Sequence, residues 1–204
     1  MSGTKCKLCG LTRPADIAAA NALMPEYIGF VFAPKSRRCL LPAQAADLKR
    51  RLTPGITAVG VFVNEAPENV ADLLNRGVID AAQLHGREGE DYIKHLRTLT
   101  NKTIIQAFKV ATPQDVAQAE QSTADCILLD SGAGSGTTFD WALLRPIRRP
   151  YFLAGGLDAQ NVADAIRALH PYAVDVSSGI EEDGRKDAEK MAAFVAAVRK
   201  EATP

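Results

Sequence analysis

The chain has 204 residues, of which 47% are hydrophobic, which suits one substantial core and excludes a disordered or fibrous protein. Its 24 basic residues balance 24 acidic ones, so no strong overall charge attracts nucleic acid or an anionic membrane. The longest mostly apolar run, Ile56–Val63, is far shorter than the ~18 residues that a membrane helix needs. Four cysteines are too sparse for a disulfide framework. We therefore expect one cytoplasmic domain, residues 1–204, that acts on a small molecule without nucleic acid or membrane partners.

Short runs rich in Val, Ile and Phe alternate with segments of helical period along the whole chain. The eight expected strands are Lys5–Cys9, Tyr27–Phe32, Ile56–Val63, Ala81–Leu84, Thr103–Phe108, Cys126–Leu129, Phe152–Ala154 and Ala173–Val176. The eight expected helices are Pro14–Leu23, Pro42–Leu52, Pro67–Arg76, Glu88–Thr98, Pro113–Ser122, Trp141–Ile147, Asn161–His170 and Asp187–Lys200. Four of these helices begin at a proline, a residue whose fixed φ suits a first helical turn.

Eight strand-then-helix units of about 25 residues predict an α/β fold, a single-domain (β/α)8 TIM barrel with short loops. An open doubly wound sheet is the alternative that periodicity alone leaves in place. In a barrel the active site lies where the strands end. The polar residues at these points are Cys9, Gln83, His85, Lys109 and Asp130.

Cys9 ends the first expected strand, and Gly10 after it lets the backbone turn and leaves the sulfur accessible. A thiol there can act as a base, although a buried structural cysteine is the commoner alternative. Strand alternation places Cys6 on the opposite face, so a redox or zinc reading of Cys-x-x-Cys is weak. Lys7 shares the face of Cys9, and we expect its charge to lower the pKa of the thiol while Asp175 pairs with Lys7.

Asp130 follows a buried strand, which would bring its carboxyl group to the barrel mouth as a general acid. The alternative is a helix N-cap, but the next expected helix starts about ten residues later. Gln83 and His85 are either ligand contacts or satisfied polar groups of the barrel interior. No zinc-type histidine cluster accompanies His85, so no metal site is expected.

Glycine-rich turns follow the last two expected strands, at Ala154–Leu157 and Ser177–Gly179. Unhindered backbone N–H groups at these places favour a phosphate site over simple loop chemistry. The loop Pro34–Arg38 offers three cations, of which an arginine can hold a carboxylate through two hydrogen bonds. For Lys35 and Arg37 a solvated surface position is the preferred interpretation.

The ordered set of motifs resembles the phosphoribosylanthranilate isomerase family along essentially the whole chain. The matching segments are Lys7–Arg13, Gly29–Arg38, Gly60–Asn64, Gln83–Gly86, Leu128–Asp130, Thr138–Trp141, Ala154–Leu157 and Val174–Gly179. Each segment alone is a weak signal, whereas the ordered set is highly specific.

The resemblance implies an Amadori rearrangement of a phosphoribosylated anthranilate, with Cys9 as general base and Asp130 as general acid and with no metal or organic cofactor. It also implies that Arg38 holds the anthranilate carboxylate. The residues that it assigns to the phosphate are Gly155, Gly156, Ser178 and Gly179, and those that would contact the rest of the substrate are Gln83, His85 and Asp175. One departure is Thr137, where many members carry lysine, so a lysine contact from this loop is not carried over.

Two other functions remain as alternatives. A histidine-pathway ribonucleotide isomerase performs a related reaction with two aspartates, and Cys9 at the end of the first strand argues against it. A catalytically silent sugar-phosphate-binding or partner-binding barrel is the other alternative. The joint presence of Cys9, Asp130 and Arg38 argues against that function.

Overall fold

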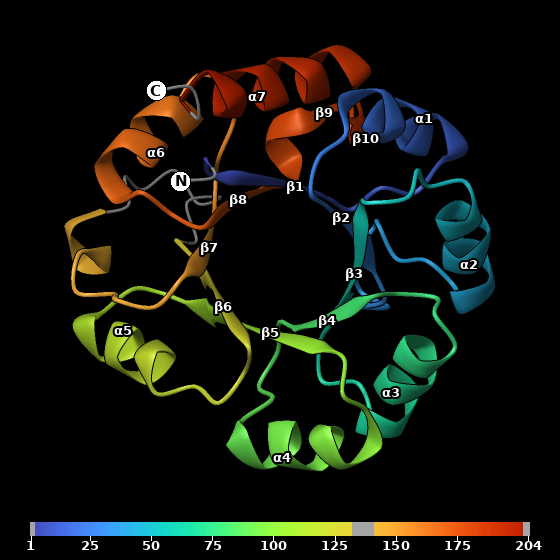
Figure 1. Ribbon diagram of the computed structural model, residues 1–204, viewed down its shortest axis with the longest axis vertical. Coiled ribbons are helices and arrows are strands. Elements are labelled where there is room, and N and C mark those ends of the chain that lie inside the picture. Colours follow the sequence, from blue (N-terminus) through green and yellow to red (C-terminus); the bar gives the residue numbers. More distant parts are fainter. Residues whose placement is uncertain (1–2, 132–140, 202–204) are drawn as a thin grey trace.

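The computed structural model describes residues 3–131 and 141–201, and eight parallel strands close into a barrel. The strands are β1 (Lys5–Cys9), β2 (Tyr27–Val31), β3 (Thr57–Phe62), β4 (Ala81–Leu84), β5 (Thr103–Lys109), β6 (Cys126–Asp130), β7 (Tyr151–Ala154) and β8 (Ala173–Val176). Each strand pairs with the next, and β8 pairs back with β1. Figure 1 looks down this ring and shows the helices around it. The predicted TIM barrel is confirmed, and the open sheet is excluded.

Seven α-helices surround the barrel in the described ranges: α1 (Pro14–Leu23), α2 (Pro42–Arg50), α3 (Pro67–Asn75), α4 (Glu90–Leu99), α5 (Pro113–Glu120), α6 (Val162–Leu169) and α7 (Ala188–Glu201). Four of them begin at proline, as predicted. The hydroxyl of Thr112 accepts a hydrogen bond from the Asp115 N–H and so caps α5. None of the helices described is long and apolar enough to span a membrane.

Most predicted helices differ from the structure by one or two residues at an end, and two of the differences have a clear physical reason. The segment predicted as Trp141–Ile147 forms only a 3-10 turn, η2 (Trp141–Leu144), because Pro146 disfavours helical backbone before it and lacks an N–H. The helix predicted from Glu88 begins at Glu90. The Glu88 carboxylate instead turns inward and accepts hydrogen bonds from the N–H groups of Asn64 and Gly86.

Side chains along each strand alternate between two apolar environments. In β1, Cys6 and Leu8 belong to the large core between the barrel and the helices. Cys9 belongs to a small cluster with Val31 and Val61 near the barrel mouth. The prediction that Cys6 and Cys9 lie on opposite faces is therefore confirmed, and β1 presents Cys9 to the barrel interior.

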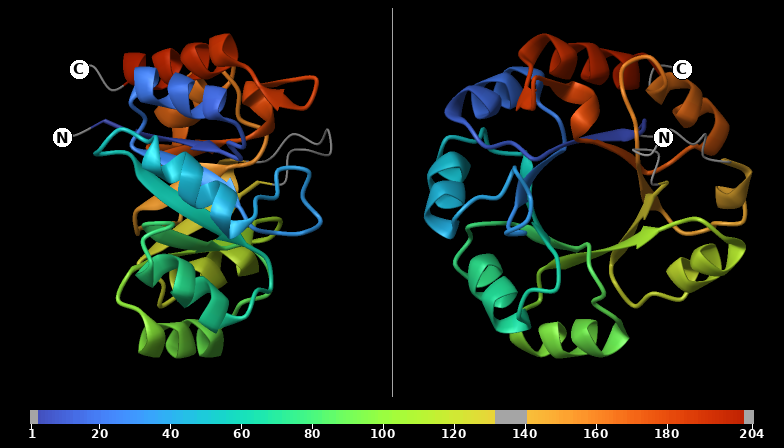
Figure 2. Two further views of the ribbon diagram at one scale, coloured as in Figure 1. Left: turned by 90° about the vertical axis from the view of Figure 1, so that its right-hand side faces the viewer. Right: turned by 180° about the vertical axis from the view of Figure 1, so that it is seen from behind.

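A short segment that the sequence reading missed follows β8. It contains η3 (Ser178–Ile180) and a hairpin of β9 (Glu181–Glu182) and β10 (Arg185–Lys186). The turn residues Asp183 and Gly184 have φ values of 46° and 77°. Positive φ at both central residues is the type I′ geometry that Asp-Gly favours. Figure 2 shows this hairpin protruding from the same end of the barrel as the loop between β2 and α2.

Candidate active site

A cavity of about 480 Å³ opens at the carboxyl ends of the strands. Nine of the ten predicted site residues line it, namely Cys9, Arg38, Gln83, His85, Asp130, Gly155, Gly156, Asp175 and Ser178. They come from strands or loops on all sides of the barrel. Closure of the barrel therefore brings together side chains that are up to 169 positions apart in the sequence, counted from Cys9 to Ser178.

Cys9 ends β1, and its residue surface is only 8% exposed. Its neighbour across the β1–β2 pair is Gly29. A Cβ atom placed on Gly29 would lie 2.6 Å from the Cys9 Sγ atom. Gly29 therefore provides the space that the thiol occupies, a role that the sequence reading missed. Gly10, with φ of 80°, turns the chain directly after Cys9 as predicted.

Burial raises the pKa of the Cys9 thiol above its ordinary value. The charge of Lys7 opposes this effect, and Lys186 opposes it more weakly, while Asp175 adds to it. The expectation of a lowered pKa is therefore wrong, although the expected influence of Lys7 has the predicted sign. Strand alternation predicts that Lys7 lies near Cys9. It does not predict how completely the other strands exclude water from the Cys9 sulfur.

Lys7 and Asp175 form an ion pair inside the barrel, as expected from their shared inward orientation. The Lys7 Nζ atom lies 2.8 Å from Oδ2 of Asp175, and the Lys7 side chain has no exposed surface. Burial disfavours the Lys7 ammonium, but Asp175 and Cys9 outweigh burial and raise the pKa of Lys7. Lys7 therefore remains a cation beside the thiol.

Asp130 ends β6 and faces His85 across the cavity. Nε2 of His85 lies 3.5 Å from Oδ2 of Asp130, and Nδ1 of His85 lies 2.9 Å from the amide nitrogen of Gln83. The Gln83 amide thus lies within hydrogen-bond distance of one ring nitrogen of His85, and the other ring nitrogen faces Asp130. Gln83, His85 and Asp130 thus form a connected polar group. The loop Gly132–Thr138, which contains Thr137, lies outside the described residues.

The two glycine turns have different surroundings. Gly155 has φ of 100°, and a Cβ atom there would lie 2.8 Å from Oδ1 of Asp130. The absence of a side chain at Gly155 therefore also leaves room for the Asp130 carboxyl group. Gly179 does not line the cavity, because it packs against the carbonyl group of Leu157. It brings the loops after β7 and β8 together, and Ser178 beside it lines the cavity.

Arg38 reaches the cavity from the loop after β2, and it is paired with Glu181 of the hairpin. Its Nε atom donates to Oε1 of Glu181 at 2.6 Å, and its Nη2 atom donates to Oε2 at 2.8 Å. Lys186 also donates to Glu181, with an Nζ–Oε1 distance of 2.8 Å. Glu181 and Lys186 are not among the described residues that line the cavity, but Glu181 pairs with the cavity residue Arg38, and the sequence analysis named neither of them. The Asp183-Gly184 hairpin signal was the only sequence feature that marked this segment.

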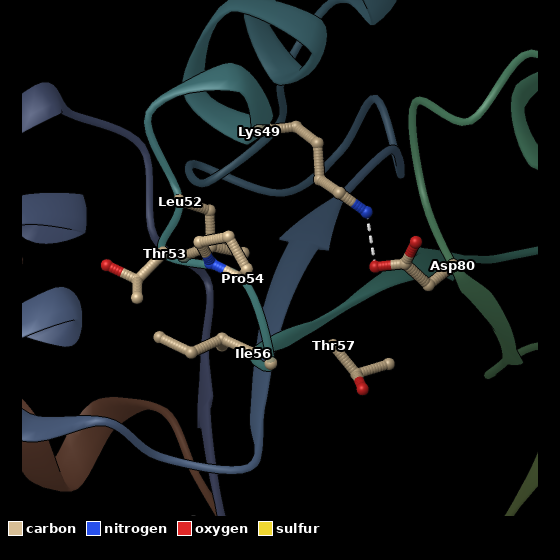
Figure 3. A pocket seen from close by; sticks show the side chains of 8 residues that line it. Lys49, Leu52, Thr53, Pro54, Ile56, Thr57 and Asp80 are labelled. Atoms are coloured by element: carbon tan, nitrogen blue, oxygen red, sulfur yellow. Dashed lines mark hydrogen bonds and ion pairs between the residues drawn. The ribbon is translucent and has the colours of Figure 1, made fainter.

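Two further cavities contain none of the predicted site residues. One of about 350 Å³ lies at the opposite end of the barrel, in the loop that leads from α2 into β3, where Lys49 pairs with Asp80 (Figure 3). The other, of about 290 Å³, lies between the loop after β2 and helix α3. Within residues 3–131 and 141–201, no three His, Cys, Asp or Glu side chains form a group that could hold a metal ion.

Comparison with known proteins decides the family. Residues 6–197 match the model of the N-(5'phosphoribosyl)anthranilate (PRA) isomerase family. The chain belongs to the phosphoribosylanthranilate isomerase family. The match runs from β1 into α7 and so includes every cavity residue named above.

Individual relatives of this isomerase family are similar over nearly their whole length. The N-(5'-phosphoribosyl)anthranilate isomerase of a Thermoanaerobacter species is 42% identical, over 96% of this chain and 98% of the relative. The crystal structure of phosphoribosyl anthranilate isomerase from Thermotoga maritima has a TM-score of 0.89 and 36% identity, over 97% of this chain and 99% of that one. A family structure in complex with reduced 1-(o-carboxyphenylamino)-1-deoxyribulose 5-phosphate has a TM-score of 0.87 and 35% identity, over 97% and 99% of the two chains.

Proposed function

We propose that this chain catalyses the Amadori rearrangement of N-(5′-phosphoribosyl)anthranilate to 1-(2-carboxyphenylamino)-1-deoxyribulose 5-phosphate, a step of tryptophan biosynthesis. The observation that supports this most is the single cavity shared by Cys9, Asp130 and Arg38 at the strand ends of a barrel of this family. The related structure that binds a reduced form of the product supports the same substrate class.

The proposed chemistry needs one acid and one base. Asp130 protonates the ring oxygen as the bond from this oxygen to C1′ breaks, and the anilino nitrogen donates its electron pair to form a C1′=N Schiff base. The Cys9 thiolate then removes the proton from C2′, and the released electron pair forms an enolamine. The enolamine becomes the ketone when the hydroxyl proton leaves and C1′ gains a proton. Only protons move between enzyme and substrate, so the proposal includes no metal or organic cofactor.

Burial of Cys9 has a consequence for the base. Because the pKa of the thiol is raised, the thiolate is a minor form of the free enzyme at neutral pH. The Lys7 ammonium is then the group that favours this minor form, and Asp175 keeps Lys7 charged. A buried thiolate is also poorly solvated by water, which makes it a stronger base than a free thiolate.

The remaining cavity residues are proposed to bind the substrate. Oδ1 of Asp175 and Oε1 of Gln83 are buried acceptors without a hydrogen-bond partner in the described part of the chain. Ribose hydroxyl groups are donors that would satisfy them. His85, between Gln83 and Asp130, would contact the ribose beside the acid.

The phosphate is proposed to bind at the turns after β7 and β8. Gly155, Gly156 and Ser178 line this side of the cavity, and Gly179 holds the two turns against each other. Backbone N–H groups of glycine turns, where the residue itself carries no side chain to hinder an anion, suit a phosphate ion. Arg38 would hold the anthranilate carboxylate through the parallel N–H groups of its guanidinium. With balanced charge, the enzyme is proposed to work in the cytoplasm without nucleic acid or membrane partners.

The test is turnover of freshly prepared phosphoribosylanthranilate, followed by the loss of its intrinsic fluorescence. We expect the wild-type chain to consume it, and the Cys9→Ala variant to be strongly impaired. Turnover of the histidine-pathway ribonucleotide alone would contradict the assignment in favour of that isomerase. Binding of the substrate without turnover would instead indicate a silent sugar-phosphate-binding barrel.

A further inference from the structure

The guanidinium group of Arg38 has two edges that can each hold a carboxylate. Glu181 occupies the side edge, formed by Nε and Nη2, at 2.6 and 2.8 Å. Nη1 makes no hydrogen bond to any residue in the described ranges, and Arg38 lines the cavity. The end of the guanidinium, formed by Nη1 and Nη2, is therefore left for a ligand while the side edge is held by the protein.

Glu181 is itself held firmly in the anionic state. Its side chain is 5% exposed, and it contacts Arg38, Lys186 and Arg37. Burial alone would raise the pKa of Glu181, but hydrogen bonds from Arg38 and Lys186 lower it to about 2. The cluster of Glu181 with Arg38, Lys186 and Arg37 contains three cations and one anion, so its charge is +2, and it stays positive even though Arg38 is already paired.

The position of Glu181 is fixed from several directions. The type I′ turn at Asp183-Gly184 closes the hairpin, and Lys186 on its second strand donates to the carbonyl oxygen of Ser177 at 2.8 Å. The carbonyl oxygen of Lys186 accepts from Nη2 of Arg13 at 2.6 Å. The carboxylate therefore sits on a braced hairpin rather than on a free loop.

The aliphatic part of the Arg38 side chain is also confined, on the side that faces the end of β1. A Cβ atom on Gly10 would overlap the Arg38 side chain, so the arginine lies directly on the backbone that follows Cys9. The aliphatic part of the Arg38 side chain contacts Gly10, and its guanidinium is held by Glu181. These two contacts leave the guanidinium little rotational freedom. This arrangement fixes the arginine relative to the thiol before any substrate arrives.

We propose that Glu181 is a positioning residue that orients Arg38 for recognition of an aromatic carboxylate on the substrate. The inference rests on the proposed function, in which Arg38 binds the anthranilate carboxylate. An arginine on a loop would otherwise lose rotamer freedom on binding, and a preformed pair has already met that cost during folding. Glu181 then contributes to affinity for the carboxylate without touching the substrate.

The alternative role for Glu181 is that of a competitor of the substrate carboxylate for Arg38. If the substrate carboxylate had to displace Glu181 from Arg38, Glu181 would compete with the substrate and its removal would tighten binding. Positioning predicts the reverse. The two roles differ in sign, so one binding measurement separates them.

The test compares the dissociation constants of two ligands. The first is reduced 1-(2-carboxyphenylamino)-1-deoxyribulose 5-phosphate, and the second is the same compound without the carboxylate. We expect Glu181→Gln to weaken binding of the first about five- to tenfold and to leave the second nearly unchanged. Glu182→Gln is the matched control, because Glu182 is the next hairpin residue and pairs only with the exposed Lys190 among described residues. It should change neither dissociation constant.

A second comparison places Glu181→Gln in an Arg38→Met background, where it should have no further effect on the carboxylated ligand. Equal weakening of both ligands, an undiminished effect without Arg38, or tighter binding would each overturn the positioning role. If the wild-type chain binds neither ligand, the proposed function fails and this inference fails with it. Normal wild-type binding with an unchanged Glu181→Gln variant would contradict the inference alone.

Discussion

Lys7 and Asp175 occupy directly paired positions on β1 and β8, and their charges meet inside the barrel at 2.8 Å. The Lys7 side chain has no exposed surface, and the carboxylate keeps one oxygen without a partner among the described residues. A buried pair of this kind is weak evidence for stability, because both charges lose their hydration. Its placement beside Cys9 and the cavity indicates a functional reason for it.

Removal of one partner of this pair should destabilise the fold. Lys7→Met leaves Asp175 as an uncompensated buried charge, and we expect a loss of about 3–5 kcal/mol in the free energy of unfolding, measured in urea. The double variant Lys7→Met/Asp175→Leu should recover much of this loss. Lys49→Met is a control, because the Lys49–Asp80 pair is partly exposed and should contribute about 0–1 kcal/mol. Equal losses of unfolding free energy in Lys7→Met and Lys49→Met would contradict the argument.

The reactivity of Cys9 should depend on pH in a direction set by burial. A raised pKa means that the thiolate forms above the pH at which a free thiol ionises. Alkylation of Cys9 by iodoacetamide, followed by mass spectrometry of its peptide, should therefore have a midpoint above that of N-acetylcysteine. In Lys7→Met the midpoint should move higher still, because the favourable charge is lost. A midpoint below that of the reference thiol would show that burial is not the dominant effect.

Gly29 should be required for the position of the thiol. In Gly29→Ala the new methyl group would lie 2.6 Å from Sγ of Cys9, so the sulfur must move away from its position in the cavity. A misplacement on the order of 1 Å can cost about 10²-fold in rate, and we expect kcat to fall by about that factor. Gly89→Ala is the control, since nothing lies near its Cβ position. A kcat in Gly29→Ala equal to that of the control would show that the thiol position is not critical.

Most of the barrel could be predicted because its signals are local. Runs of β-branched residues and helix-starting prolines predicted the strands and four helix starts, and strand ends in a closed barrel meet at one mouth. Cys9 and Asp130 could therefore be placed in one cavity from their positions alone. The helix expected at Trp141–Ile147 failed where the local signal of Pro146 opposed it.

The rest of the site depends on contacts between distant segments. Glu181 meets Arg38 from 143 positions away, and nothing near Glu181 in the sequence distinguishes it from a surface glutamate. The pKa of Cys9 also depends on distant segments of the chain. Strand alternation predicted the nearby charge of Lys7, but burial of the sulfur is produced by residues of several strands together.

Asp130 should act mainly on the chemical step. Asp130→Asn keeps the size of the side chain but removes the acidic proton, so we expect kcat to fall by about 10² or more with little change in KM. Asp91→Asn, at a fully exposed position on α4, is the control. Steady-state kinetics with phosphoribosylanthranilate measures both constants. A near-normal kcat would remove Asp130 from the role of general acid.

Arg38 should act mainly on binding, and lysine should not replace it. Arg38→Lys exchanges a planar fork for a single ammonium group, which cannot hold Glu181 and a ligand carboxylate through two parallel pairs of hydrogen bonds. We expect KM to rise several-fold in Arg38→Lys and further in Arg38→Met, with a smaller change in kcat. Lys35→Met is the matched control, because Lys35 is an exposed cation on the same loop. Arg37→Met is measured beside it, because Arg37 pairs with Glu181 from an exposed position. If KM is unchanged in both Arg38 variants but rises in Arg37→Met, Arg37 is the group that holds the anthranilate carboxylate.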